Sequence, residues 1–360
     1  MKWSLKIIRI AGIDVYVHAT FFILILWIGL AYWGESGTLA AVANGVGFIL
    51  ALFGCVVLHE LGHALTARRY GINTHNIILL PIGGVALLEK MPDDPKHEIV
   101  VALAGPAVNI MIAFILWLWL SANNELTPPD QFSVTGAPFL ARLLVINIFL
   151  AIFNLLPAFP MDGGRVLRAA LAMRMSYERA TQLAATIGQG LALWMGLVGL
   201  FYNPFLIIIA LFVWFAAAAE AAAANVKYAL SGVVVGNAMK TEFHSLSPDD
   251  PLSRVVDLTL AGNQKDFPVV VDGSLIGVLT QSGFLNGLQE EYGKQTRVDS
   301  VMNKGVQTAD ISEPLQQVLE RLQTSDYRMI AVTDSGKLVG IIDIDNILEL
   351  IKIQSALHTH

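Results

Sequence analysis

Long stretches without charge constrain the fold of this 360-residue chain more than any other feature of its sequence. The clearest covers residues 99–120, 22 positions without one Asp, Glu, Lys or Arg, and an α-helix needs about 20 apolar residues to cross a bilayer. A buried helix of a soluble protein would not run that long without a polar stripe. In all, six apolar segments are predicted to be transmembrane helices: residues 19–33, 46–65, 99–120, 139–156, 183–201 and 204–224.

Composition agrees with a chain that lies largely in a membrane. Only 14% of its residues are charged, whereas a soluble domain has about 25%. The single cysteine, Cys55, excludes an internal disulfide framework and is expected to be a small packing residue between helices. No small-residue cleavage site follows the first apolar run, so no cleavable signal peptide is expected.

Three ionisable residues interrupt the second apolar segment, in which residues 46–58 are apolar or glycine throughout. His59 and His63 are spaced so that both imidazoles leave the same face of a helix, with Glu60 near enough to reach water on a metal there. In a soluble helix a solvated polar face would explain this pattern better. A membrane helix has no such face, and burying polar groups without partners is costly. The spacing therefore predicts a zinc site of the His-Glu-x-x-His type.

A candidate third ligand follows the fourth apolar segment. A catalytic zinc site takes three protein ligands and keeps one position open. Asp162 comes after Pro157 and Pro160, which break the preceding helix, and before Gly163 and Gly164. Taken alone, this Asp is better explained as the cap of the next helix. Taken with the two histidines, it is predicted to complete the metal site.

Three motifs together resemble the site-2 protease family of intramembrane zinc metalloproteases. They are the His-Glu-x-x-His pattern, the Gly-Pro-Ala-Val-Asn segment at 105–109 and the Asn-x-x-Pro-x-x-Pro-x-Asp-Gly run at 154–163. They occur in the family's order, which makes the resemblance specific. It implies hydrolysis of peptide bonds in or near the transmembrane segments of membrane-tethered protein substrates.

The resemblance also implies roles for individual residues. It implies one zinc ion per chain, with His59, His63 and Asp162 as ligands. It implies Glu60 as the catalytic carboxylate. The residues expected to contact substrate or to support the ligands are Asn154, Asn109, Gly83 and Gly84.

The connection between the second and third apolar segments is predicted to contain short extended segments around a proline and a glycine pair, over residues 77–88. Open strand edges cannot face lipid, but they are tolerated beside a cavity. Such a strand could pair with an unwound substrate by β-addition. A surface hairpin that merely covers the site explains the pattern equally well.

Lysine and arginine predict the orientation in the membrane. They occur at the amino terminus, in the second connection and in the fourth, and are absent from residues 34–45 and 121–138. Both termini are therefore expected in the cytoplasm, in a multi-pass protein of the cell membrane. His59 then lies 13 residues into a helix that enters from outside, or about 20 Å deep. The metal site is expected nearer the cytoplasmic side.

The carboxyl-terminal part repeats itself and is acidic, with 10 Lys and Arg against 17 Asp and Glu over residues 229–360. Met239 and Met302 are 63 residues apart, as are Gly277 and Gly340. A tandem repeat of this length and pattern resembles a pair of CBS domains, which often bind adenosine nucleotides. The acidic charge argues against nucleic acid as a ligand.

The expected fold is therefore an α-helical polytopic membrane domain, with about six transmembrane helices, followed by a soluble α/β tandem CBS module. The membrane domain is placed at 1–228 and the module at 229–360, on the cytoplasmic side, with repeats at about 234–296 and 297–351. A CBS-regulated ion channel or transporter is the alternative, because such proteins also carry CBS pairs. Asp162 is unexplained in that alternative.

Both repeats depart from the adenosine-binding pattern of Gly, two apolar residues, Ser or Thr, two variable residues and Asp. The first repeat keeps Thr280 but has Gly283 in place of the Asp, and the second has Asp343 where phosphate would sit. A carboxylate beside a polyphosphate is repulsive, so the module is predicted to be weakened or altered as an ATP sensor. Homodimerisation or substrate docking is then its expected role.

Overall fold

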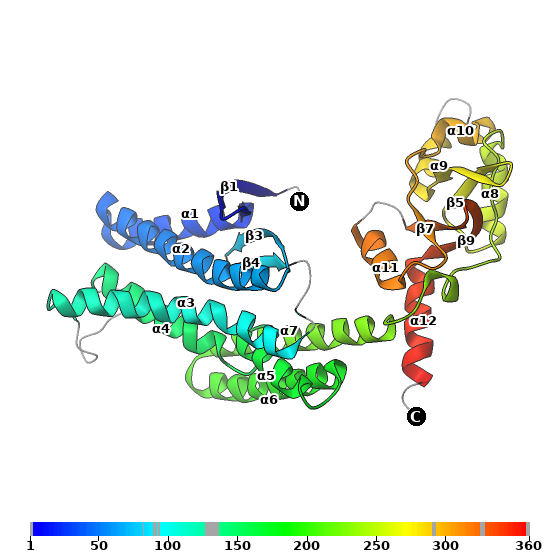
Figure 1. Ribbon diagram of the computed structural model, residues 1–360. Helices are drawn as coiled ribbons and strands as arrows, with labels where there is room; N and C mark the ends of the chain where they lie inside the picture. The colour runs from blue at the N-terminus through cyan, green and yellow to red at the C-terminus, as the bar shows by residue number, and fades with distance from the viewer. Residues whose placement is uncertain are drawn as a thin grey trace. The chain divides into compact units, whose positions relative to one another are not determined.

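The structure is a computed structural model. It describes residues 3–81, 83–88, 92, 94–126, 137–289, 293–324 and 328–357. The chain divides into two compact units, residues 1–224 and 225–360 (Figure 1), and each unit is described by itself.

The described part of the first unit contains seven helices, and six of them account for the apolar segments. The seven helices are α1 (Ala19–Ser36), α2 (Leu39–Arg69), α3 (Pro95–Ala122), α4 (Phe139–Asn154), α5 (Asp162–Ala172), α6 (Tyr177–Tyr202) and α7 (Pro204–Ala229). Five of them, α1, α2, α3, α6 and α7, are long and apolar enough to span a membrane, and α4 is a shorter apolar helix. All six predicted segments are thus helical, which confirms the polytopic helical fold.

The helix α2 starts seven residues before its predicted start at residue 46. The reason is local: the side chain of Thr38 accepts a hydrogen bond from the N–H of Ala41 and caps the helix. Gly37, in the left-handed conformation, ends α1 directly before it. His59 therefore lies 20 residues after the start of α2, about 30 Å along the axis.

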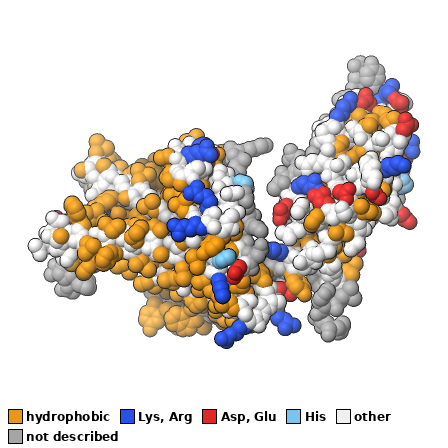
Figure 2. All heavy atoms as spheres, viewed as in Figure 1, with side chains coloured by type: hydrophobic (Ala, Val, Ile, Leu, Met, Phe, Trp, Pro, Cys, Tyr) orange, Lys and Arg blue, Asp and Glu red, His pale blue; other side chains and the backbone are white. Residues whose placement is uncertain are grey.

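The surface of the first unit is largely apolar, as Figure 2 shows for one face. On α3 the exposed side chains include Ile110, Phe114 and Leu118, spaced by one turn each. In water such a continuous apolar surface would be unfavourable. It is the surface expected of a helix that faces lipid.

A four-stranded sheet packs against α2. Its strands are β1 (Ser4–Ile10), β2 (Ile13–His18), β3 (Thr74–Leu80) and β4 (Gly83–Leu88). They lie in the order β1-β2-β3-β4, with only β2 and β3 parallel. Alternate residues of β2 are buried among Phe53 and Leu61 of α2. This packing brings β4, at the edge of the sheet, beside the middle of α2.

The second unit is an α/β module of two similar halves. The first half contains α8 (Leu252–Ala261), β5 (Phe267–Val271), β6 (Ser274–Leu279), α9 (Gln281–Gly287) and α10 (Val298–Val301). The second contains β7 (Thr308–Asp310), α11 (Leu315–Thr324), β8 (Met329–Asp334), β9 (Lys337–Asp343) and α12 (Ile344–Leu357). In each half an antiparallel strand pair, β5-β6 or β8-β9, packs with helices around its own apolar core.

The residues that reveal the repeat in the sequence contact each other between the two sequence repeats, 234–296 and 297–351. A Cβ on Gly340 would lie 2.7 Å from the sulfur of Met239, and a Cβ on Gly277 would lie 2.7 Å from the sulfur of Met302. Each methionine thus packs on the glycine of the other repeat. The 63-residue period in the sequence therefore corresponds to two equivalent contacts between the repeats.

Candidate metal centre

Three buried donor atoms from two helices converge on one point in the first unit. The Nε2 atoms of His59 and His63 on α2 are 3.1 Å apart. Each lies 3.2 Å from Oδ2 of Asp162, the first residue of α5. All three residues are buried. Among the described residues they form the one group of His, Cys, Asp or Glu side chains close enough to share a metal ion.

The spacing of these donors fits zinc. Donors bound at about 2.0–2.1 Å around a tetrahedral ion lie about 3.3–3.4 Å apart, close to the distances found. Two imidazole nitrogens and a carboxylate oxygen are also a ligand set that zinc prefers. Gly105 of α3 keeps this space open, because a Cβ there would lie 2.2 Å from Nε2 of His63 and 2.6 Å from Nε2 of His59.

The far nitrogens of both histidines are held by hydrogen bonds, which directs each Nε2 toward the cluster. Nδ1 of His59 lies 2.5 Å from Oδ1 of Asn109, and Nδ1 of His63 lies 2.7 Å from the carbonyl oxygen of Val101. Asn109 in turn donates to Oδ1 of Asn147 on α4 at 2.9 Å. Asn109 therefore contacts a predicted ligand directly.

Asp162 does not cap a helix from outside, because it is the first residue of α5, with Met161 as the cap. The glycines after it allow the chain to pack tightly at this point. A Cβ on Gly163 would lie 2.3 Å from the carbonyl oxygen of Leu155, and one on Gly164 would lie 2.6 Å from the carbonyl carbon of Ala158. The start of α5 and the preceding loop thus form one close-packed piece.

Glu60 lies beside the cluster and against the edge of the sheet. Its Oε2 accepts a hydrogen bond from the N–H of Ala86 on β4 at 3.2 Å. A Cβ on Gly84 would lie 2.8 Å from Cγ of Glu60, so the glycine permits this approach. Glu60 and the three clustered residues line a cavity of about 430 Å³, a size typical of ligand-binding pockets. The same cavity is lined by all four residues predicted to support or contact substrate, namely Asn154, Asn109, Gly83 and Gly84.

Two residues of this region have no role in the sequence interpretation. The sequence marks Gly105 only as part of a motif, because its contact with the histidines depends on how α2 and α3 pack. Asn147 is an amide inside an apolar segment, which is a usable signal. It donates to the carbonyl oxygen of Leu143 at 2.8 Å and lies 3.5 Å from the sulfur of Cys55, which is buried.

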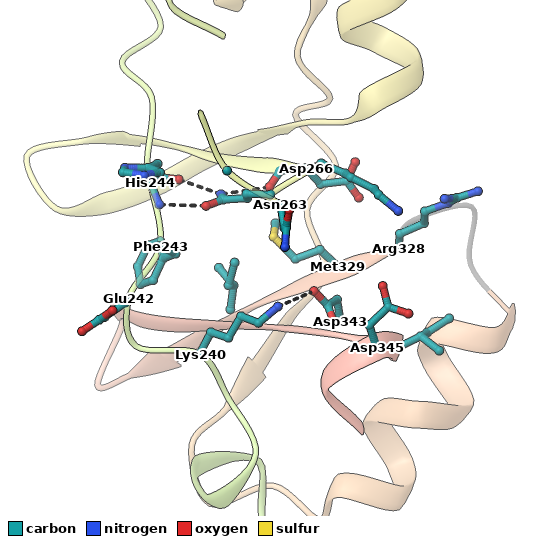
Figure 3. Close-up of a pocket in the computed structure, with 15 residues that line it drawn as sticks. Lys240, Glu242, Phe243, His244, Asn263, Asp266, Arg328, Met329, Asp343 and Asp345 are labelled. Carbon is teal, nitrogen blue, oxygen red and sulfur yellow. Dashed lines mark hydrogen bonds and ion pairs between the residues drawn. The ribbon is translucent and has the colours of Figure 1, made fainter. Parts of the chain in front are cut away.

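A second cavity, of about 880 Å³, lies in the CBS unit (Figure 3). Lys240 and Asp343 lie side by side in its lining and form an ion pair, with Nζ 3.3 Å from Oδ2. Met329 and Ile341 contribute apolar surface. Burial raises the pKa of Asp266, another residue of the lining, whose carboxylate accepts the N–H of Gln281 at 2.8 Å.

Asp343 has a structural task that Thr280 performs in the other half. Oδ1 of Asp343 accepts the N–H of Asn346 at 2.8 Å, at the start of α12. Oγ1 of Thr280 accepts the N–H of Gly283 at 3.1 Å and caps α9. Both side chains satisfy a free backbone N–H at a helix start. Asp343, at the position where the adenosine-binding pattern has Ser or Thr, therefore keeps the helix cap but places a carboxylate in the cavity.

Comparison with known proteins identifies both parts of the chain. The model of Peptidase family M50 matches residues 47–135 and 130–196, and the CBS domain model matches residues 235–290 and 298–353. The zinc metalloprotease MJ0392 of Methanocaldococcus jannaschii is 34% identical over 98% of this chain and 97% of its own. The putative zinc metalloprotease Rip3 of Mycobacterium tuberculosis is 31% identical over 98% of this chain and 94% of its own.

Among solved structures, the site-2 protease from Methanocaldococcus jannaschii is 37% identical, with a TM-score of 0.45, over 61% of this chain and 95% of that chain. Fold, site and relatives define an intramembrane zinc metalloprotease. The chain belongs to peptidase family M50, the site-2 proteases, and carries a C-terminal pair of CBS domains. The alternative of a CBS-regulated channel or transporter is not favoured.

Proposed function

We propose that His59, His63 and Asp162 bind one zinc ion per chain and that Glu60 is the catalytic carboxylate. The observation that carries this proposal is the convergence of three buried donors at 3.1–3.2 Å beside a carboxylate that lines the same cavity. Zinc, when bound, supplies a Lewis acid that polarises the scissile carbonyl and lowers the pKa of water.

Glu60 moves the proton in this scheme. Its carboxylate takes a proton from the attacking water and returns it to the leaving amine, first as general base and then as general acid. The N–H of Ala86, donated to Oε2, fixes the orientation of this carboxylate.

The substrate proposed is a membrane-anchored protein that unwinds beside β4. A helical peptide bond is shielded by its own hydrogen bonds, so the segment must become extended before attack. β4 is the last strand in the order of the sheet, and Gly83 and Gly84 line the cavity. A substrate strand added at this edge would run past Glu60. This favours pairing of the substrate with β4 over the alternative that the hairpin only covers the site.

Both termini and the CBS module are proposed to be cytoplasmic, with the boundary of the membrane domain at residues 228 and 229. The distribution of lysine and arginine supports this, with Arg68 and Arg69 in the last turn of α2. In a Cys55→Ala background, Asn124→Cys should react with an impermeant thiol reagent in intact cells. Ser231→Cys should not react. The reverse labelling would invert the topology.

The CBS pair is proposed to act in homodimerisation or substrate docking, with a weakened site for adenosine nucleotides. Asp343 supports this, because its carboxylate projects into the cavity and is already paired with Lys240. A polyphosphate would have to displace this pair and approach a like charge.

The assignment of ligands is tested by His59→Ala, with His97→Ala as the matched control. His97 is half-exposed and stacks on Tyr70 at 4.1 Å. His59→Ala should lose both bound zinc and cleavage, measured by metal analysis and on a membrane-anchored reporter that the wild-type protein cleaves. His97→Ala should keep both. Equal zinc content in the two variants would refute His59 as a ligand.

A further inference from the structure

The guanidinium of Arg168 is a buried charge that the proposed chemistry does not use. Arg168 is 2% exposed, and it is the largest fully buried residue among those that the structure describes. It lies on α5, six residues after Asp162. A charge this far from water is costly unless its hydrogen bonds are satisfied by partners in good geometry.

Arg168 is held by four groups from four parts of the unit. Nε and Nη2 donate to Oε1 of Glu98 on α3, at 2.9 and 2.5 Å, and Nη1 donates to Oε1 of Glu220 on α7. Its Cζ lies 5.2 Å from the ring centre of Phe159, in the loop before α5, and 4.9 Å from that of Tyr177, at the start of α6. Only an arginine offers this planar fork and stacking surface together.

These contacts fix the piece of chain that carries Asp162. Asp162 and Arg168 lie about 9 Å apart along one helix, and Phe159 is three residues before Asp162. The glycines after Asp162 lock the loop and the helix together, as the contacts of Gly163 show. Any shift of Arg168 therefore moves the Asp162 carboxylate relative to the two histidines, which lie on a different helix.

The two carboxylate partners differ in how easily they can be separated from Arg168. Glu98 is 1% exposed, so breaking its pair would leave a charge deep in the protein. The side chain of Glu220 is 41% exposed, where an ion pair is weaker and can open to water. Glu220 also lies on α7, whose last five residues, 225–229, already belong to the second unit.

We propose that Arg168 is a positioning residue for Asp162, and that the pair with Glu220 makes this positioning depend on α7. The inference rests on the proposed role of Asp162 as a ligand. A shift of α7 that loosens Glu220 from Arg168 would then leave the metal held less tightly.

The test is the rate of zinc release from the full-length protein to a chelator, which needs no substrate. Glu220→Gln should release zinc about 10-fold faster than the wild type, in the range found for residues behind metal ligands. The matched control is Glu178→Gln, a partly exposed glutamate at the start of α6, which should match the wild type. Arg168→Lys keeps the charge but loses the fork and should release zinc faster still.

One result would overturn the inference: zinc release by Glu220→Gln at the wild-type rate. A lower midpoint of thermal unfolding beside that unchanged rate would assign Glu220 a structural role only. Asp162→Asn separates this failure from that of the proposed function. If Asp162→Asn also keeps zinc as the wild type does, the ligand assignment itself is wrong.

Discussion

The cluster of His59, His63 and Asp162 and the CBS cavity both contain ionisable side chains, but these side chains differ in burial and in pairing. His59, His63 and Asp162 are buried and direct their free atoms at one another. In the CBS cavity the side chains of Lys240 and Asp343 are 47% and 27% exposed and already form an ion pair. Donors buried within 3.2 Å of one another suit a shared cation, whereas the partly exposed Lys240 and Asp343 pair with each other without a ligand. Burial and pairing, more than the number of charges, separate a metal centre from a charged cleft.

The largest expected effect that tests this contrast is that of Gly105→Ala. The added methyl would meet both histidine Nε2 atoms, within 2.2 and 2.6 Å, on a helix that cannot easily shift. Zinc affinity and cleavage should each fall by more than about 100-fold, beyond the range for residues that only support ligands. Metal analysis and a reporter assay measure them.

The matched control is Gly54→Ala, where an added Cβ meets nothing within 4 Å. It lies on the same helix as the histidines and should retain zinc and activity. If Gly105→Ala behaves like Gly54→Ala, the space beside the histidines does not hold a metal.

A smaller effect is expected in the CBS cavity. The full-length protein should bind ATP only near millimolar affinity, because Asp343 repels phosphate and occupies Lys240. Asp343→Thr would keep the cap, as Thr280 does in the other half, and release Lys240. Affinity should rise by about 10-fold or more, since a charge-assisted hydrogen bond contributes about 1.5–3 kcal/mol. Calorimetry measures both proteins, and low-micromolar binding by the wild type would contradict the contrast.

Spacing along the chain predicts the parts of this molecule that depend on one element. The His59 and His63 pair and the apolar helices are of this kind. The early start of α2 was also readable, because Thr38 is a strong cap after a glycine. The missed features depend on packing between distant elements. Gly105 matters only where α2 and α3 meet. Arg168 pairs with Glu98, which is 70 positions away in the sequence, and with Glu220, which is 52 positions away.

The same limit applies to Asp343. The sequence predicts its repulsion of phosphate, because the motif position is recognisable. It does not reveal that Lys240, from the start of the other repeat, lies within 3.3 Å of its carboxylate. That partner is brought near by the pairing of Lys240 with Ile341 across the two halves.

The central claim is that Glu60 moves protons while the two histidines and Asp162 hold the metal. Glu60→Gln tests it most directly, with zinc content and reporter cleavage measured on the same purified protein. We expect about one zinc per chain, as in the wild type, and cleavage reduced by about 100- to 10,000-fold, the range for loss of a general acid–base group. Cleavage near the wild-type rate, or loss of the zinc together with the activity, would contradict the account.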